Sequence, residues 1–215
     1  MPWWLTRYMH WNVNRIFKNK DTVFPTSDQE KSNKPAFINI DRVCEFLDSG
    51  KRPVLLIGSQ AMQNLDRAEI LSDAVKTLNI PTYVSGMARG LLSQSGLHIY
   101  RHARKKALRE ADLVILAGVP CDFRLDYGRH INHQAKMVSV NLNREDLYMN
   151  RKPTLGILAD PSAFLINLSQ EYRQKDWGNW QNILQDWDQQ RKDEISHQAE
   201  EKTESINPLK ICMAL

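Results

Sequence analysis

Residues 109–129, READLVILAGVPCDFRLDYGR, decide the fold. Within them, residues 113–117 form an apolar run without alternation of polar and apolar side chains, which is typical of a strand buried on both faces of a parallel sheet. Gly118 closes this run, and a polar loop with Asp122 and Arg124 follows it. Because ligands of doubly wound sheets lie at the carboxyl ends of the strands, this loop is either a ligand-binding segment or a solvated connection.

Apolar segments on both sides of this run predict four further strands. They cover residues 53–57, 81–84, 136–141 and 154–159. Between them, we expect a short helix from Asp41 to Gly50, a helical stripe over 65–78, a basic helix over 99–108, and a helix over 161–168 that begins at a proline. Strands that alternate with helices at this spacing predict an α/β fold with a parallel sheet and right-handed crossovers.

The two ends of the chain differ in character from this central part. Residues 1–20 are basic and aromatic, and either dock on another domain or lie on a membrane surface. Residues 21–35 are polar and predict a linker. A helical apolar stripe is formed near the other end by Trp180, Ile183, Leu184 and Trp187. After it, residues 188–205 predict a solvated helix or a disordered tether. The expected parts are 1–38 (docking segment and linker), 39–170 (central domain) and 171–215 (helical linker and the start of a further domain).

Composition and charge narrow the class of protein. At 215 residues with 42% hydrophobic residues, the chain suits one domain with extensions. The net charge of +4 argues neither for nor against nucleic acid by itself, and we expect no nucleic-acid partner. No apolar run approaches the ~20 residues of a membrane span, and the first residues lack the apolar h-region of a signal peptide. Cys44, Cys121 and Cys212 lack C-x-x-C spacing, which favours a reducing compartment over a disulfide framework.

Small residues follow three of the expected strands, at Gly58-Ser59, Ser85-Gly86 and Gly118. They let backbone N–H groups approach a pyrophosphate, and the helix N-termini that follow favour anions. No G-x-G-x-x-G motif follows the first strand, however, so the usual dinucleotide fingerprint is missing. The residues alone therefore indicate nucleotide binding without identifying the nucleotide.

Other kinds of site find less support. The histidine pairs His98/His102 and His130/His133 have no adjacent acidic or cysteine ligands, so we expect no metal site. Ser59 has no identifiable base, and no nucleophile elbow is present. The basic side chains of residues 101–109 predict a solvated face, with phosphate binding by one or two of them as the alternative.

Five segments carry a resemblance to a known family. They are RPVLLIGSQAM (52–62), IPTYVSGMARGLLS (80–93), ALREADLVILAGVPCDFRLDYGR (107–129), MVSVNLNREDLYMN (137–150) and GILADPSAFL (156–165). In this order they resemble the central domain of thiamine-diphosphate enzymes of the acetolactate synthase superfamily, and most of all the eukaryotic acetolactate synthase-like proteins that are regarded as 2-hydroxyacyl-CoA lyases. Residues 3–17 resemble the linker after the family's first domain, and Asn207-Pro208 the start of its third.

This resemblance implies a Rossmann-like, six-stranded parallel sheet of the NAD/FAD-binding type, flanked by helices. In acetolactate synthases the domain holds FAD that performs no redox step, and in CoA-handling relatives it accepts ADP or the adenine-nucleotide part of CoA. The positions that match the family's nucleotide contacts are Gly58, Ser59, Gln60, Gly96, Leu97, His98, Gly118, Val119, Asp122, Arg124, Asn141, Leu142 and Asp160.

The chain departs from the family pattern in two of these loops. The family's Asp-x-Asp after the fourth expected strand reads Asn141-Leu142-Asn143 here, which removes two charges that accept hydrogen bonds from a nucleotide. In the loop after residue 117, Pro120 replaces the first arginine of the family's pattern. Both departures count against FAD and are compatible with another adenine nucleotide.

The resemblance also says where the family's chemistry lies. Its catalytic glutamate belongs to the first domain, and the loop that binds magnesium and the cofactor's diphosphate belongs to the third, so we expect no catalytic residue and no metal ligand in this chain. The first interpretation is the middle part of a carbon-carbon lyase that uses thiamine diphosphate and Mg²⁺ together with N- and C-terminal domains in a homo-oligomer. The alternative is a stand-alone, non-catalytic module that binds an adenine nucleotide or another protein. The implied location is cytoplasmic or at the endoplasmic reticulum, with membrane contact only through a segment outside this sequence.

Overall fold

A computed structural model describes residues 2–17, 39–92, 99–172, 174–201 and 207–214. The chain divides into two compact units, residues 1–33 and residues 34–215. The first unit contains helix α1 (Trp3–Phe17). Its large aromatic side chains Trp3, Trp4, Tyr8 and Trp11 are exposed. Among the described residues, no helix is both long and apolar enough to cross a membrane. Whether α1 docks on a domain or on a membrane surface stays a prediction.

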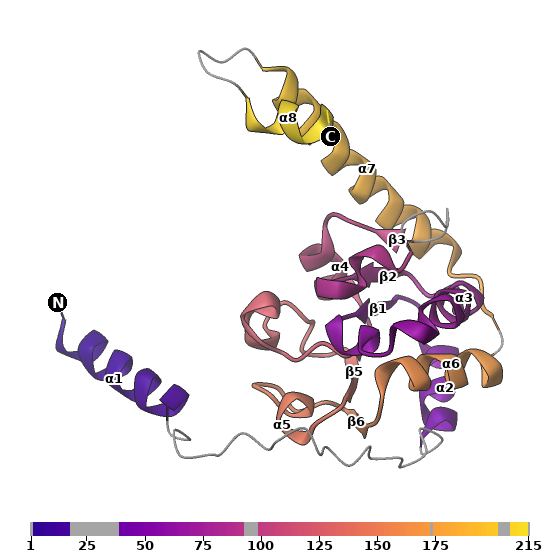
Figure 1. The fold of residues 1–215 in the computed structure, drawn as a ribbon, viewed down its shortest axis with the longest axis horizontal. Helices are drawn as coiled ribbons and strands as arrows, with labels where there is room; N and C mark the ends of the chain where they lie inside the picture. The colour runs from indigo at the N-terminus through magenta and orange to yellow at the C-terminus, as the bar shows by residue number, and fades with distance from the viewer. Residues whose placement is uncertain (1, 18–38, 93–98, 173, 202–206, 215) are drawn as a thin grey trace. The chain divides into compact units, whose positions relative to one another are not determined.

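The second unit contains one sheet of six parallel strands in the order β3-β2-β1-β4-β5-β6 (Figure 1). The strands are β1 (Pro53–Ile57), β2 (Thr82–Val84), β3 (Ile99–Tyr100), β4 (Leu113–Ala117), β5 (Lys136–Asn141) and β6 (Leu155–Leu158). The strand order reverses between β1 and β4, which is the topological switch point of a Rossmann-like sheet. Ile57 pairs with Ala117, so β1 and β4 end level with each other. The α/β fold with a parallel sheet is therefore confirmed.

Helices cover both faces of this sheet (Figure 1). The first face packs against α2 (Ile40–Ser49), α3 (Ala68–Leu78) and α6 (Pro161–Glu171). The second packs against α4 (Arg104–Glu110) and α7 (Gly178–Glu200). Side chains of β1 alternate between the two cores, since Leu55 lies in the first and Leu56 in the second, and both are almost fully buried. This double burial explains the unbroken apolar runs of the central strands.

Helix α7 forms much of the second core. Its apolar stripe is confirmed, because Trp180 and Leu184 are buried and Trp187 packs beside them. The Trp180 indole donates a hydrogen bond from Nε1 to the carbonyl of Pro53 (3.0 Å), and the ammonium of Lys106 lies 3.9 Å from the ring centre of Trp187. The helix continues to Glu200, as in the solvated-helix alternative, and α8 (Pro208–Ala214) contacts it.

One prediction was wrong. The helix expected over 99–108 is instead the short strand β3 followed, after a break, by α4. The break is held by a carboxylate far away in the sequence, because Asp188 on α7 accepts hydrogen bonds from the backbone N–H groups of Arg101 and His102 (both 2.7 Å). Ala103 then takes a left-handed conformation (φ 55°) before α4 begins. A two-residue strand has no periodicity, and its partner on α7 cannot be inferred from local sequence.

Candidate functional site

Two glycines bring the loops after β1 and β4 into direct contact at the switch point. The backbone N–H of Gly58 donates a hydrogen bond to the carbonyl of Ala117 (2.9 Å). A Cβ atom on Gly58 would collide with the carbonyl oxygen of Gly118 and with the Val119 side chain. Gly118 has φ +73°, and a Cβ there would lie 2.9 Å from the backbone nitrogen of Ala61. Only glycine at both positions allows this close approach of the two chain segments.

The polar residues after β1 tie neighbouring loops together. Gln60 lies in the 3₁₀ helix η1 (Ser59–Met62); its Oε1 accepts a hydrogen bond from the backbone N–H of Leu142 (2.9 Å), and its Nε2 donates one to Asp146 (2.8 Å). The Ser59 hydroxyl accepts a hydrogen bond from the backbone N–H of Met87 (3.2 Å), in the 3₁₀ helix η3 (Gly86–Gly90). Both side chains thus fix the loops around the switch point.

The ends of β5 and β6 hold buried polar groups. Asn141 is fully buried; its Nδ2 donates a hydrogen bond to Ser139 (2.9 Å), whereas its Oδ1 has no partner among the described residues. The buried hydroxyl of Ser162, at the N-terminus of α6, has no described partner either. Asp160 caps this helix by accepting a hydrogen bond from the backbone N–H of Ser162 (2.8 Å). Buried polar atoms without partners need a water molecule or a ligand group to satisfy them.

Asp122 and Arg124 form an ion pair after β4. Asp122 caps the 3₁₀ helix η4 (Phe123–Gly128), and Arg124 lies in its first turn. The guanidinium donates from Nε (2.9 Å) and Nη2 (2.5 Å) to Oδ2 of Asp122. This hydrogen bonding raises the pKa of Arg124 above its ordinary value. The Arg124 side chain is 39% exposed, and its Nη1 has no partner among the described residues. It can therefore meet an anion, but with part of its charge already compensated.

Two more arginines lie near this ion pair. Arg104, at the start of α4, donates a hydrogen bond from Nη2 to the backbone carbonyl of Arg124 (3.1 Å). Burial lowers the pKa of Arg104, and the nearby positive charges of Arg89 and Arg124 lower it further. Sequence reasoning did not single out Arg89, and it assigned Arg104 to a solvated face. The break after β3 places Arg104 beside Arg124, and that segment was the part of the fold predicted wrongly. Arg89 lies in η3, directly after β2.

The expected site residues thus fall into two groups at one edge of the sheet. The first group lies at the ends of β1, β4, β5 and β6 and contains Gly58, Ser59, Gln60, Gly118, Val119, Asn141, Leu142 and Asp160. The second group is Asp122 with Arg124, beside α4. Gly96, Leu97 and His98 lie outside the described residues. The assignment of all these residues to a nucleotide stays a prediction.

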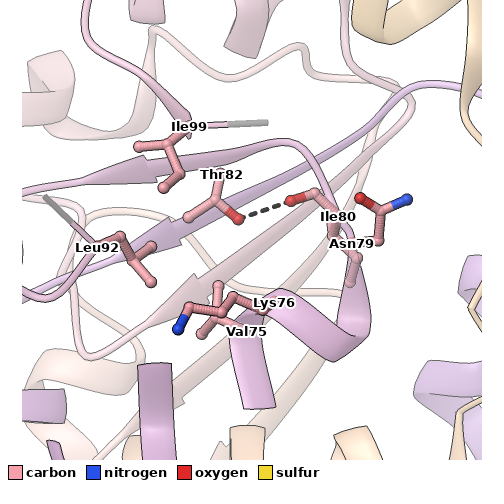
Figure 2. A pocket seen from close by; sticks show the side chains of 7 residues that line it. All are labelled: Val75, Lys76, Asn79, Ile80, Thr82, Leu92 and Ile99. Atoms are coloured by element: carbon pink, nitrogen blue, oxygen red, sulfur yellow. Dashed lines mark hydrogen bonds between the residues drawn. The ribbon is translucent and has the colours of Figure 1, made fainter. Parts of the chain in front are cut away.

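A cavity at the far end of β2 has a different character (Figure 2). It has a volume of about 10 Å³, enough for roughly one water molecule. Val75 and Ile80 lie on its wall, and the Thr82 hydroxyl beside them donates a hydrogen bond to the Ile80 carbonyl (2.7 Å). It is a packing gap between α3 and the edge of the sheet, and no ligand of nucleotide size fits it.

Comparison with known proteins identifies the family. The family model of the thiamine pyrophosphate enzyme central domain matches residues 40–168. The chain belongs to this family. The 2-hydroxyacyl-CoA lyase 2 of Danio rerio is 40% identical over 179 residues, which are 80% of this chain and 29% of that protein. That of Homo sapiens is 36% identical over 179 residues (80% and 28%), and a probable acetolactate synthase of Mycobacterium bovis is 30% identical over 135 residues (63% and 24%).

The expected family and its six-stranded central domain are thus confirmed. This thiamine pyrophosphate enzyme central domain spans less than a third of the length of these curated relatives. The family implies thiamine diphosphate, usually with Mg²⁺. Within the described ranges, no group of three or more His, Cys, Asp or Glu side chains is arranged to hold a metal ion.

Proposed function

We propose that this central domain binds the adenosine-diphosphate part of a nucleotide at the carboxyl ends of β1 and β4, as a non-catalytic part of a thiamine-diphosphate-dependent carbon-carbon lyase. The observation that supports this most is the group of three arginines, Arg89, Arg104 and Arg124, with Asp122 as the carboxylate bonded to Arg124. Their charges sum to about +2, which complements a diphosphate. The group lies beside the switch point, where doubly wound sheets bind their ligands.

The other polar groups of this edge suit the neutral part of such a ligand. Neither Oδ1 of Asn141, an acceptor, nor the Ser162 hydroxyl, which can donate and accept, has a hydrogen-bond partner among the described residues. The neutral Asn141 and Asn143 stand where the family pattern has acidic residues. We therefore expect ADP or the nucleotide part of CoA to bind more tightly than FAD.

The names of the relatives support the wider proposal. Two of them are 2-hydroxyacyl-CoA lyases and one is a probable acetolactate synthase. A thiamine cofactor, when bound, supplies the carbanion chemistry. The residues of this chain would hold a CoA or another adenine nucleotide and orient it, while N- and C-terminal domains in a homo-oligomer would supply the catalytic groups. The substrate class proposed for that assembly is a 2-hydroxyacyl-CoA or a 2-oxo acid.

Isothermal titration of the 215-residue chain with ADP, CoA and FAD tests the nucleotide proposal. We expect saturable binding of ADP and CoA, with FAD weaker. Arg124→Gln should weaken the binding of ADP, whereas Arg191→Gln, which removes the same charge from an exposed ion pair on α7, should not. Absence of binding by all three nucleotides, or equal loss in both variants, would contradict the proposal.

A further inference from the structure

A second, larger groove lies at the amino ends of β5 and β6, opposite the carboxyl ends that form the proposed nucleotide site. It has a volume of about 800 Å³ and is lined by the end of α4, by the loop before β5 and by the loop before β6. Its apolar floor includes Ile131, Ala135 and Met137, all buried. Met137 on the floor of the groove and Asn141 in the proposed nucleotide site are four residues apart on β5, about 13 Å along the strand. On the wall, the two sites are neighbours, because the backbone N–H of Tyr127 donates a hydrogen bond to the carbonyl of Asp122 (2.8 Å). The proposed function leaves this groove unused.

The walls of this groove are strongly basic. Arg109, Arg129 and Lys152 line it with exposed side chains, and none of them forms an ion pair with a described residue. None of the residues that line it is acidic. Elsewhere in the second unit, exposed cations form ion pairs, as Lys76 does with Asp73 and Arg191 with Glu194. A groove with several uncompensated cations favours an anionic ligand.

A fourth cation makes the groove rigid. Arg151 donates hydrogen bonds from Nη1 to the carbonyls of Gly128 (3.0 Å) and Ile131 (2.7 Å), and from Nη2 to that of Asn132 (2.9 Å). These carbonyls carry no net charge, so the guanidinium orders the loop while its positive charge stays uncompensated. The wall of the groove is thus ordered by the hydrogen bonds of Arg151, and the positive charge of Arg151 is not neutralised by a carboxylate among the described residues.

The backbone beside Arg151 is strained. Asp126 (φ 49°), Tyr127 (φ 56°) and Gly128 (φ 87°) are three consecutive residues in the left-handed region. Non-glycine residues rarely adopt it, and such strain gathers at functional sites when the surrounding contacts hold it. Here the hydrogen bonds of Arg151 and one from Asn150 Nδ2 to the Cys121 carbonyl (2.9 Å) hold it. The strained turn presents Tyr127, which is about half exposed, on the wall of the groove.

The pKa of a neighbouring histidine is consistent with a positively charged groove. Burial lowers the pKa of His130, and the positive charges of Lys105, Arg104 and Arg109 lower it further, against the opposing effect of Asp126. The imidazole thus lies in a field in which positive charge dominates.

We propose that this groove binds a small, free ligand with at least two phosphate groups. One phosphate would meet one or two of the cations, whereas Arg109, Arg129 and Lys152 on separate segments suit several phosphate groups at once. The side chains of Asn132, Asn150 and Thr154 supply further polar contacts, and Tyr127 gives a ring on which a planar group can stack.

Titration of the 215-residue chain with inorganic phosphate, pyrophosphate and tripolyphosphate tests this assignment. We expect affinity to rise in that order and to fall in high salt, because exposed charges are screened. The variant Arg109→Gln/Arg129→Gln/Lys152→Gln should weaken tripolyphosphate binding by about tenfold or more. The control Arg42→Gln/Arg191→Gln/Lys210→Gln loses the same net charge outside the groove and should bind within about twofold of the unchanged chain. The variant Arg124→Gln distinguishes binding in this groove from binding at the nucleotide site. It should leave the affinity of the groove for tripolyphosphate unchanged.

Nuclear magnetic resonance of the histidine rings gives a readout that does not depend on a folded variant. The ring signals of His133, which lines the groove, should shift on addition of tripolyphosphate to the unchanged chain, and those of His10 on α1 should not. Unmoved His133 signals, or equal loss of affinity in both triple variants, would overturn the proposal. Charge-dependent binding to vesicles with phosphomonoester headgroups, without binding of pyrophosphate or tripolyphosphate, would overturn it too.

Discussion

Single residues decide how the switch-point loops fit together, and the pair Gly58 and Gly118 is the tightest point. Sequence reasoning named both glycines as sites of close backbone approach, but to a ligand. In the structure the partner of Gly58 is the loop after β4 itself, because its missing Cβ leaves room for the carbonyl of Gly118. Which loops meet depends on the strand order, and no local pattern gives that order.

Gly58→Ala is expected to destabilise the fold by roughly 1–3 kcal/mol, since the added methyl group collides with backbone that cannot turn away. Gly90→Ala is the matched control, because a Cβ there meets nothing within 4 Å and should change stability by no more than about 0.5 kcal/mol. Urea unfolding of both variants measures the difference. Equal midpoints would show that the switch-point loops relax freely.

Arg124 was predicted as a phosphate ligand, and the structure gives it a carboxylate partner in Asp122. Arg124→Ala should weaken ADP binding by about 1.5–3 kcal/mol, the usual effect of losing a hydrogen bond to a charged group. Arg191→Ala, also part of an exposed ion pair, is the control. Unchanged ADP affinity in a calorimetric titration would assign Arg124 to a purely structural role.

His130 reports on the charge of the second groove. Its pKa is expected below the ordinary value of 6.5, since burial and the neighbouring cations both disfavour the protonated ring. Arg109→Gln removes one of these cations and should raise the His130 pKa, whereas Arg42→Gln should leave it unchanged. A magnetic-resonance titration of the ring measures both. A His130 pKa that does not respond to Arg109 would mean that burial alone sets it.

At the scale of elements, the strands that are buried on both faces were predicted to the residue for 53–57, 113–117 and 136–141. An unbroken apolar run is sufficient to predict a strand of this kind, because both of its faces are buried. The segment around β3 could not be predicted, because it is defined by contacts with α7. Arg104 was assigned to a solvated face for the same reason, since its position at the start of α4 depends on that segment.

Asp188 holds α7 to the β3–α4 connection and should be important for stability. Burial raises its pKa, but hydrogen bonds from the backbone of His102, from Lys192 and from the backbone of Arg101 outweigh this and lower the pKa below 3.8. Asp188→Asn should cost about 1–3 kcal/mol at neutral pH. The stability that the carboxylate contributes is present above its unfolded pKa, so the difference should shrink as pH falls below about 4.

Asp186→Asn, at an exposed position two residues earlier on the same helix, is the control for this prediction. Urea unfolding at pH 7 and at pH 3 measures both variants. A difference between Asp188→Asn and the unchanged chain that does not depend on pH would contradict the ionic anchor.

At the scale of the whole molecule, the family match, the strand order and the arginine group lead to one interpretation. The match to residues 40–168 and the Rossmann-like order make this chain a thiamine pyrophosphate enzyme central domain. The family resemblance supplied the sixth strand, which the residues alone did not predict. The second groove could not be predicted from the sequence, because its basic residues come from three separate segments.

The central claim is that this domain binds an adenine nucleotide and leaves the thiamine cofactor to other domains. Thermal unfolding of the 215-residue chain with ADP, and separately with thiamine diphosphate and Mg²⁺, tests it most directly. A ligand that binds only the folded state stabilises it by about 2.7 kcal/mol at 100 times its Kd. We expect ADP to raise the unfolding temperature and thiamine diphosphate with Mg²⁺ to leave it unchanged. Stabilisation by thiamine diphosphate with Mg²⁺ but not by ADP would show that this domain does not bind the nucleotide as proposed.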